Sequence, residues 1–138
     1  MREDSKSYVM AERNQNRQAI RMGNRSGSHE NCIRIGANET PAHALAKYLI
    51  ASDLIRQGVS ILTEAIFENT YKGESGRPDI FVLDDGRIIE IMETETLSNC
   101  SEKVCKYPAR YQSDIEAKDA STVIREYHER IKQWGRIE

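Results

Sequence analysis

The apolar positions of residues 40–58 recur at helical spacing. Thr40 suits a helix N-cap, Pro41 suits the first helical position and Gly58 suits the residue just past the end. The expected buried stripe consists of Ala42, Leu45 and Leu49, flanked by Tyr48, Ala51 and Ile55. This segment is predicted to form an amphipathic helix.

Three segments after this helix have the composition of β-strands. Residues 59–69, 78–83 and 87–94 are rich in Ile, Val, Leu and Phe. The sequence Asp-Asp-Gly at 84–86 separates the last two, and Asp-Gly is a strong signal for a tight hairpin turn. We therefore expect a β-hairpin with its turn at residues 85–86.

The rest of the chain predicts helices more clearly than strands. Ser98 suits the N-cap of a short helix that would end near Lys106, before Pro108. Residues 121–134 carry a second helical stripe, formed by Val123, Ile124, Tyr127, Ile131 and Trp134. Residues 108–120 are polar and predict no strand, whereas the short apolar segment 32–35 could add one. The predicted order α-β-β-β-α-α indicates an α/β fold.

Composition and charge divide the 138-residue chain into two parts. Residues 1–38 have a net charge of +3 and are rich in Asn, Ser, Gln and Gly, while residues 39–138 have a net charge of −5. We expect the first part to be a mobile basic arm, because it has too few apolar residues to offset chain entropy. Such an arm can contact nucleic-acid phosphates, or it can be a solvated tail without a partner. The second part is expected to be the α/β domain.

Two features bear on the cellular compartment. No apolar run approaches the ~18–20 residues of a membrane span, and the N-terminus lacks the apolar region of a secretory signal. We therefore expect a cytoplasmic protein without a membrane partner.

The three cysteines are an odd number, which argues against a disulfide framework. His29, Cys32, Cys100 and Cys105 are four potential zinc ligands; the other interpretation is ordinary reduced thiols.

Acidic residues interrupt the apolar strands. Glu90 is surrounded by large apolar residues, where a lone carboxylate is expensive to bury. Asp79 begins the partner strand, and a turn at 85–86 places it near residues 92–93, a few positions from Glu90. Glu64 adds a third carboxylate in the preceding strand. A hard divalent ion, Mg²⁺ or Mn²⁺, would hold these groups together. In the other interpretation, the three acids face solvent on the rim of the sheet.

This order of elements resembles the PD-(D/E)XK nuclease superfamily, and is most similar to its competence-protein CoiA-like branch. The resemblance covers residues 40–107 and rests on the helix, the "RPD" step and the "IIEIM" strand. It implies a restriction-endonuclease-like core, with a helix, a three-stranded mixed or antiparallel sheet and following helices. It also implies Mg²⁺- or Mn²⁺-dependent hydrolysis of DNA, with Asp79 and Glu90 as metal ligands and Glu64 as an added ligand.

The resemblance assigns further residues. Arg77, His43 and Lys47 would contact the nucleic acid. The family pattern ends in Glu-x-Lys, but this chain has Met92 at the lysine position, so Lys103 or Lys106 from the following helix would have to supply the charge.

A second departure concerns the sheet, because the family core has a fourth strand that residues 108–120 do not predict. The sheet could be truncated, completed by residues 32–35, or completed by a second copy in a homodimer, since an exposed sheet edge is a liability. These departures leave open a second interpretation, a nuclease-like fold that binds DNA without cleaving it.

Overall fold

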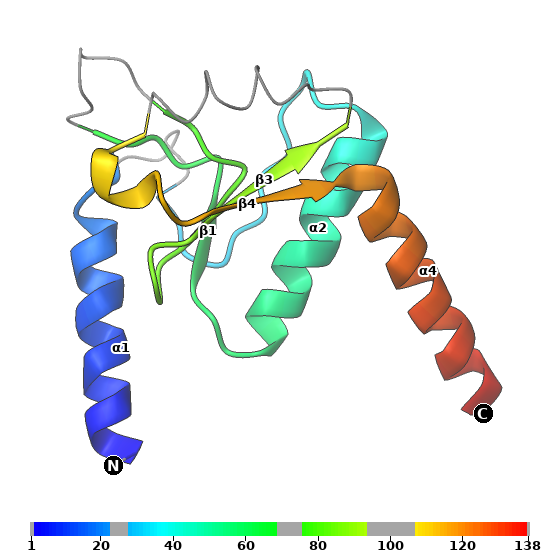
Figure 1. Ribbon diagram of the computed structural model, residues 1–138, viewed down its shortest axis with the longest axis horizontal. Helices are drawn as coiled ribbons and strands as arrows, with labels where there is room; N and C mark the ends of the chain where they lie inside the picture. Colours follow the sequence, from blue (N-terminus) through cyan, green and yellow to red (C-terminus); the bar gives the residue numbers. More distant parts are fainter. Residues whose placement is uncertain (1, 23–27, 69–75, 94–106, 138) are drawn as a thin grey trace.

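The computed structural model describes residues 2–22, 28–68, 76–93 and 107–137. Within these ranges the chain forms an α/β fold with three α-helices and one open four-stranded mixed sheet (Figure 1). The elements in chain order are α1 (Arg2–Arg17), α2 (Pro41–Arg56), β1 (Ile61–Thr63), β2 (Ile80–Val82), β3 (Ile88–Met92), the 3₁₀ turn η2 (Ala109–Tyr111), β4 (Ile115–Asp119) and α4 (Ala120–Ile137). The helix predicted over residues 98–106 lies outside the described residues.

The sheet has the order β1-β2-β3-β4, with antiparallel pairing up to β3 and parallel pairing of β3 with β4. The fourth strand corrects the prediction that residues 108–120 contain none. Its residues 115–119 are half-buried or exposed at the sheet edge, so they lack the apolar pattern that marks an interior strand. Because this chain supplies the strand itself, the sheet needs neither residues 32–35 nor a second copy to provide it.

Helix α2 begins and ends as predicted. The Thr40 hydroxyl accepts a hydrogen bond from the His43 amide, Pro41 occupies the first turn, and Gly58 has a φ of +83°. The predicted apolar stripe is rotated, however, because Leu45 and Tyr48 are 44% and 50% exposed. The residues that α2 buries are Ala46, Lys47, Leu49 and Ala51. A lysine, Lys47, therefore lies on the buried face of α2, outside the predicted apolar stripe.

The β2–β3 hairpin is present, but its register differs from the prediction. Ile80 pairs with Ile89, so Asp79 falls opposite Glu90 and not opposite residues 92–93. The reason is a longer turn, in which the Val82 amide donates to the Arg87 carbonyl and Gly86 adopts a φ of +79°. The shift brings the two acidic side chains closer than the sequence suggested.

Strand β1 is shorter than the predicted 59–69 because Glu64 has a φ of +57°, a left-handed conformation that breaks the extended backbone. Residues 31–34 run along the edge of β1 without forming a strand. The Asn31 amide donates to the Ile61 carbonyl at 2.8 Å, and the Arg34 amide donates to the Thr63 hydroxyl at 2.8 Å.

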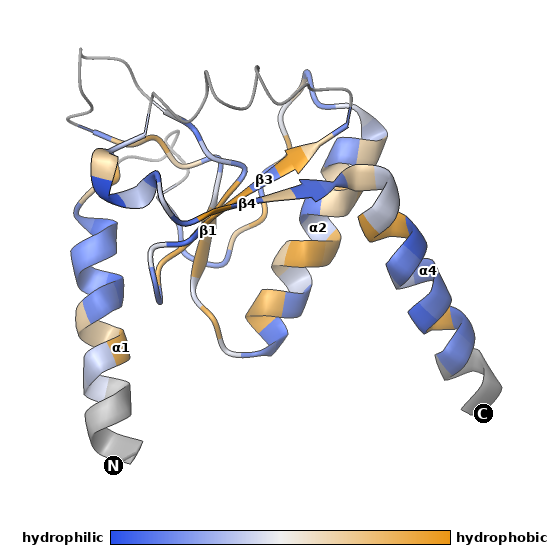
Figure 2. Cartoon of the chain, in the orientation of Figure 1, coloured by the Kyte–Doolittle hydropathy of each residue, from blue (hydrophilic) through white to orange (hydrophobic). Residues whose placement is uncertain are grey.

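The N-terminal segment differs from the predicted mobile arm. Residues 2–17 form α1, Ile20 is 2% exposed in the core, and the buried Asn16 amide donates to the Leu83 carbonyl at 2.7 Å. Arg13 also makes a two-point contact with Asp84 at 2.8 and 3.0 Å. A few anchoring residues fix this segment, although its average composition is polar (Figure 2).

Each face of the sheet has its own core. One core contains apolar residues from alternate strand positions, such as Ile61, Ile80 and Ile89, packed under α2 and the start of α4. The other is aromatic and contains Phe67, Phe81, Tyr107 and Tyr111 together with Ile20.

Helix α4 spans the predicted residues 121–134. Among the described helices, none is long and apolar enough to cross a membrane.

Candidate active site

Five predicted residues meet where the first turns of α2 approach one end of the sheet. His43 and Lys47 lie one helical turn apart on α2, Glu64 follows β1, Asp79 precedes β2 and Glu90 lies within β3. A hydrogen bond from the Thr40 hydroxyl to Glu93 ties the start of α2 to the residue after β3. The helix cap thus helps to set the position of His43 and Lys47 over the strand ends.

His43 connects α2 to Asp79. Its Nε2 lies 3.3 Å from Asp79 Oδ1, and its Nδ1 lies 2.6 Å from Glu39 Oε1. The hydrogen bond to Asp79 and the charges of both carboxylates raise the pKa of His43 to about 9, although partial burial opposes the shift. At neutral pH, His43 is therefore an imidazolium that donates from both ring nitrogens.

Lys47 is a fully buried ammonium between two carboxylates. Its side chain is 0% exposed, and Nζ lies 2.8 Å from Glu39 Oε1 and 3.0 Å from Glu64 Oε1. An unpaired charge at this depth would be very costly, so both contacts are needed to hold the lysine inside.

Glu39 is a site residue that the sequence reasoning missed. Burial opposes its ionisation, but hydrogen bonds from Lys47, the Gly36 amide and His43 outweigh burial and lower the pKa of Glu39. The signal that could have found it is the spacing of Glu39, His43 and Lys47, each four residues from the next. This spacing places His43 and Lys47 one turn apart on the same face of α2. Glu39, the residue before the Thr40 cap, continues the same line of side chains.

Asp79 and Glu90 form the innermost part of the site, with relative exposures of 8% and 2%. Burial alone would raise the pKa of Asp79. Hydrogen bonds from His43, the Ile91 amide and Glu90 outweigh burial and lower it. The Ile91 amide donates to Asp79 Oδ2 at 2.8 Å, and the Tyr107 hydroxyl donates to Glu90 Oε1. The two carboxyl groups thus lie side by side, and each accepts a hydrogen bond from a neighbouring donor.

The donor chemistry of this pair fits a hard divalent ion. Mg²⁺ commonly takes one or two carboxylates and keeps several waters, and adjacent Asp79 and Glu90 offer that number. Glu64 is turned toward Lys47. Within the described ranges, no group of three or more His, Cys, Asp or Glu side chains is placed to hold a metal. The carboxylate pair, and not a triplet, is therefore the part of the site that suits an ion.

Comparisons with protein-family models, curated proteins and solved structures gave no match. What this site does must therefore be inferred from its own residues.

The remaining predicted residues are exposed or lie outside the described ranges. Arg77 is exposed, two positions before Asp79. Lys103 and Lys106 are outside the described residues, as are the potential zinc ligands Cys100 and Cys105. Cys32 is exposed and free.

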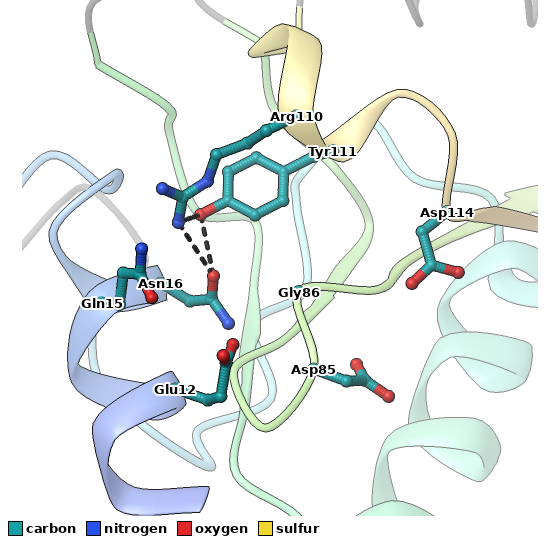
Figure 3. A pocket seen from close by; sticks show the side chains of 8 residues that line it. All are labelled: Glu12, Gln15, Asn16, Asp85, Gly86, Arg110, Tyr111 and Asp114. Carbon is teal, nitrogen blue, oxygen red and sulfur yellow. Dashed lines mark hydrogen bonds between the residues drawn. The ribbon is translucent and has the colours of Figure 1, made fainter. Parts of the chain in front are cut away.

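A cavity of about 270 Å³ lies on the α1 side of the β2–β3 turn (Figure 3). It is lined by Glu12, Gln15, Asn16, Asp85, Gly86, Arg110, Tyr111 and Asp114. Figure 3 shows Arg110 and Tyr111 directed at the Asn16 side chain, to which they donate at 3.0 and 2.9 Å. These contacts link α1 to η2, so Asn16, Arg110 and Tyr111 serve to fix α1.

The raised pKa of His43 predicts a loss of stability at alkaline pH. The folded-state pKa of about 9 exceeds the ordinary value of 6.5, so the stabilisation is fully present below about pH 6.5 and is lost as pH rises through about 9. The loss should stay below about 3 kcal/mol, because 1.36 kcal/mol per pKa unit is an upper limit that solvent screening of this partly buried ring reduces. Urea unfolding at pH 6 and pH 9.5 measures it.

The control variants for this pH effect are His43→Gln and His128→Gln. His128 is exposed on α4. The first substitution should remove most of the dependence between pH 6 and 9.5, and the second should retain it. Equal pH dependence in the parent and His43→Gln would contradict the His43–Asp79 ion pair.

Proposed function

We propose that this protein is a metal-dependent nuclease that hydrolyses phosphodiester bonds of DNA. The observation that carries the proposal is the buried carboxyl pair of Asp79 and Glu90, aligned by the hairpin register and contacted by His43 at Asp79. Two adjacent buried carboxyl groups are a costly arrangement for stability alone, because they cannot both ionise in a low dielectric without repelling each other. Such a pair is typical of a site that binds a cation.

The topology supports the resemblance to the restriction-endonuclease-like fold. That resemblance implies a fourth strand after the hairpin and its following segment, and β4 lies in this place, parallel to β3. The strand removes one of the two departures from the family pattern, which leaves Met92 as the other.

In this proposal Asp79 and Glu90 hold the ion, while Glu64 stays paired with Lys47. When bound, Mg²⁺ or Mn²⁺ would lower the pKa of a water and neutralise phosphoryl oxygens. The Ile91 amide fixes one oxygen of Asp79, and the Tyr107 hydroxyl fixes one oxygen of Glu90. Both carboxylates are therefore oriented before a ligand arrives, which reduces the reorganisation that binding requires.

Lys47 and His43 supply the positive charge that the family pattern places at Met92. Met92 is half-buried and carries no charge, whereas Lys47 brings an ammonium to within 3.0 Å of Glu64. The resemblance implied that Lys103 or Lys106 would supply this charge. Helix α2 is a second source of positive charge, and its His43 contacts Asp79 directly.

A cleavage assay tests the proposal. The parent protein is expected to cut single-stranded or plasmid DNA with Mg²⁺ or Mn²⁺, and to cut neither with EDTA, because a bound ion would be needed to activate the attacking water. Gel electrophoresis of the products measures the rate.

The alternative is a nuclease-like fold that binds DNA without catalysis, and Met92 is the observation that favours it. This alternative predicts salt-sensitive DNA binding without metal-dependent cutting, and binding that survives Asp79→Asn. Metal-dependent cutting that Asp79→Asn abolishes would exclude the alternative.

A further inference from the structure

A small cavity of about 80 Å³ opens beside the carboxylate site. Its lining consists of Arg34, Ile35, Gly36, Glu64 and Arg77. The volume exceeds the ~10–15 Å³ that a single water requires, so a group of a few heavy atoms fits. Glu64 belongs both to this cavity and to the Lys47 contact, which places the cavity directly next to the proposed catalytic residues.

The two arginines of this cavity come from separate parts of the chain. Arg34 lies on the segment along the edge of β1, where its amide donates to the Thr63 hydroxyl, and Arg77 lies two residues before Asp79. Neither guanidinium forms a hydrogen bond or ion pair within the described ranges. Most other described arginines with part-buried side chains do, as in the Arg13–Asp84 and Arg87–Glu116 pairs.

The charge balance of the cavity favours an anion. Two arginines and one carboxylate, Glu64, line it, and Glu64 also contacts Lys47 at 3.0 Å. The two guanidinium groups therefore leave a local excess of positive charge on a chain whose net charge is −2. Because the whole protein does not attract polyanions, contact with DNA would depend on local groups such as these.

We infer that Arg34 and Arg77 form a binding subsite for a backbone phosphate of DNA, next to the phosphodiester that is cleaved. This inference rests on the proposed function and adds the position of the bound strand. Guanidinium groups bind phosphate oxygens through two parallel hydrogen bonds, which fix orientation as well as affinity. The subsite would hold the strand so that the neighbouring phosphodiester reaches Asp79 and Glu90.

The test uses Arg34→Gln, Arg77→Gln, the double variant and Arg56→Gln on the full chain. Arg56 lies at the opposite end of α2 with its side chain 58% exposed, so it is the matched control. Fluorescence anisotropy with a labelled single-stranded oligonucleotide in EDTA gives the Kd. Cleavage rates with Mg²⁺ give KM and kcat separately.

Each subsite variant is expected to weaken binding about tenfold, the usual effect of losing one charge-assisted hydrogen bond. The slope of log K against log salt should fall by about 0.7 for each lost phosphate contact on a single strand. KM should rise by a similar factor while kcat changes much less, since neither arginine contacts the carboxylate pair in the structure.

Two outcomes separate this inference from the proposed function. Subsite variants that match Arg56→Gln in both Kd and KM would overturn the subsite, even when the parent cuts DNA. A parent that neither binds nor cuts DNA would overturn the subsite and the proposed function together.

Discussion

Replacing Asp79 with asparagine is expected to lower the rate of Mg²⁺-dependent DNA cleavage by about 10³-fold. The substitution removes the charge that holds the ion but keeps an oxygen that accepts from the Ile91 amide. A metal ion contributes several kcal/mol to stabilising the transition state, and each 1.36 kcal/mol is a factor of ten in rate. Single-turnover cleavage of an end-labelled oligonucleotide measures the loss.

The matched control is Asp85→Asn, which changes a carboxylate in the turn of the same hairpin. Its side chain is 54% exposed, and an asparagine can still accept the hydrogen bond from the Arg87 amide. This variant should cut DNA at the parent's rate. If Asp79→Asn retains the parent's rate while remaining folded, the assignment of Asp79 as a metal ligand is wrong.

Replacing Lys47 with methionine is expected to reduce the free energy of unfolding by about 3 kcal/mol. Methionine fills much of the same slot, so the main loss is the charge, which leaves Glu39 and Glu64 without their shared cation. Removing one partner of a buried ion pair typically costs about 3–5 kcal/mol. The lower end applies because both carboxylates are partly exposed, at 11% and 20%. Urea unfolding at pH 7, followed by circular dichroism, gives the value.

Two further variants show whether this effect comes from the ion pairs. Combining Lys47→Met with Glu39→Gln and Glu64→Gln should recover part of the loss, because no unpaired carboxylate then remains. Lys132→Met changes a lysine whose side chain is 53% exposed on α4, and should alter stability by less than about 0.5 kcal/mol. A loss at Lys47 as small as that at Lys132 would contradict the buried network.

Local signals in the sequence predicted the parts of the fold that depend on neighbouring residues. Thr40, Pro41 and Gly58 set the bounds of α2 through capping and backbone geometry. The Asp-Gly step predicted the β2–β3 hairpin, and through it the proximity of Asp79 and Glu90. These features could be read from the sequence because each is decided within a few residues.

The parts that were wrong depend on contacts between distant residues. Strand β4 forms because residues 115–119 can pair with β3, and its polar edge residues gave no alternating pattern. Helix α1 is fixed by Arg13, Asn16 and Ile20, which its polar average composition conceals. Lys47 on the buried face of α2 could not be expected before Glu39 and Glu64 were known to meet it.

The measurement that tests the central claim most directly is DNA cleavage by the parent, Asp79→Asn and Asp85→Asn, run side by side. Each protein is incubated with single-stranded and with plasmid DNA, in Mg²⁺, in Mn²⁺ and in EDTA. The account predicts metal-dependent cutting by the parent and by Asp85→Asn, and none above background by Asp79→Asn. No cutting by the parent on either substrate with either metal, or equal cutting by all three proteins, would contradict it.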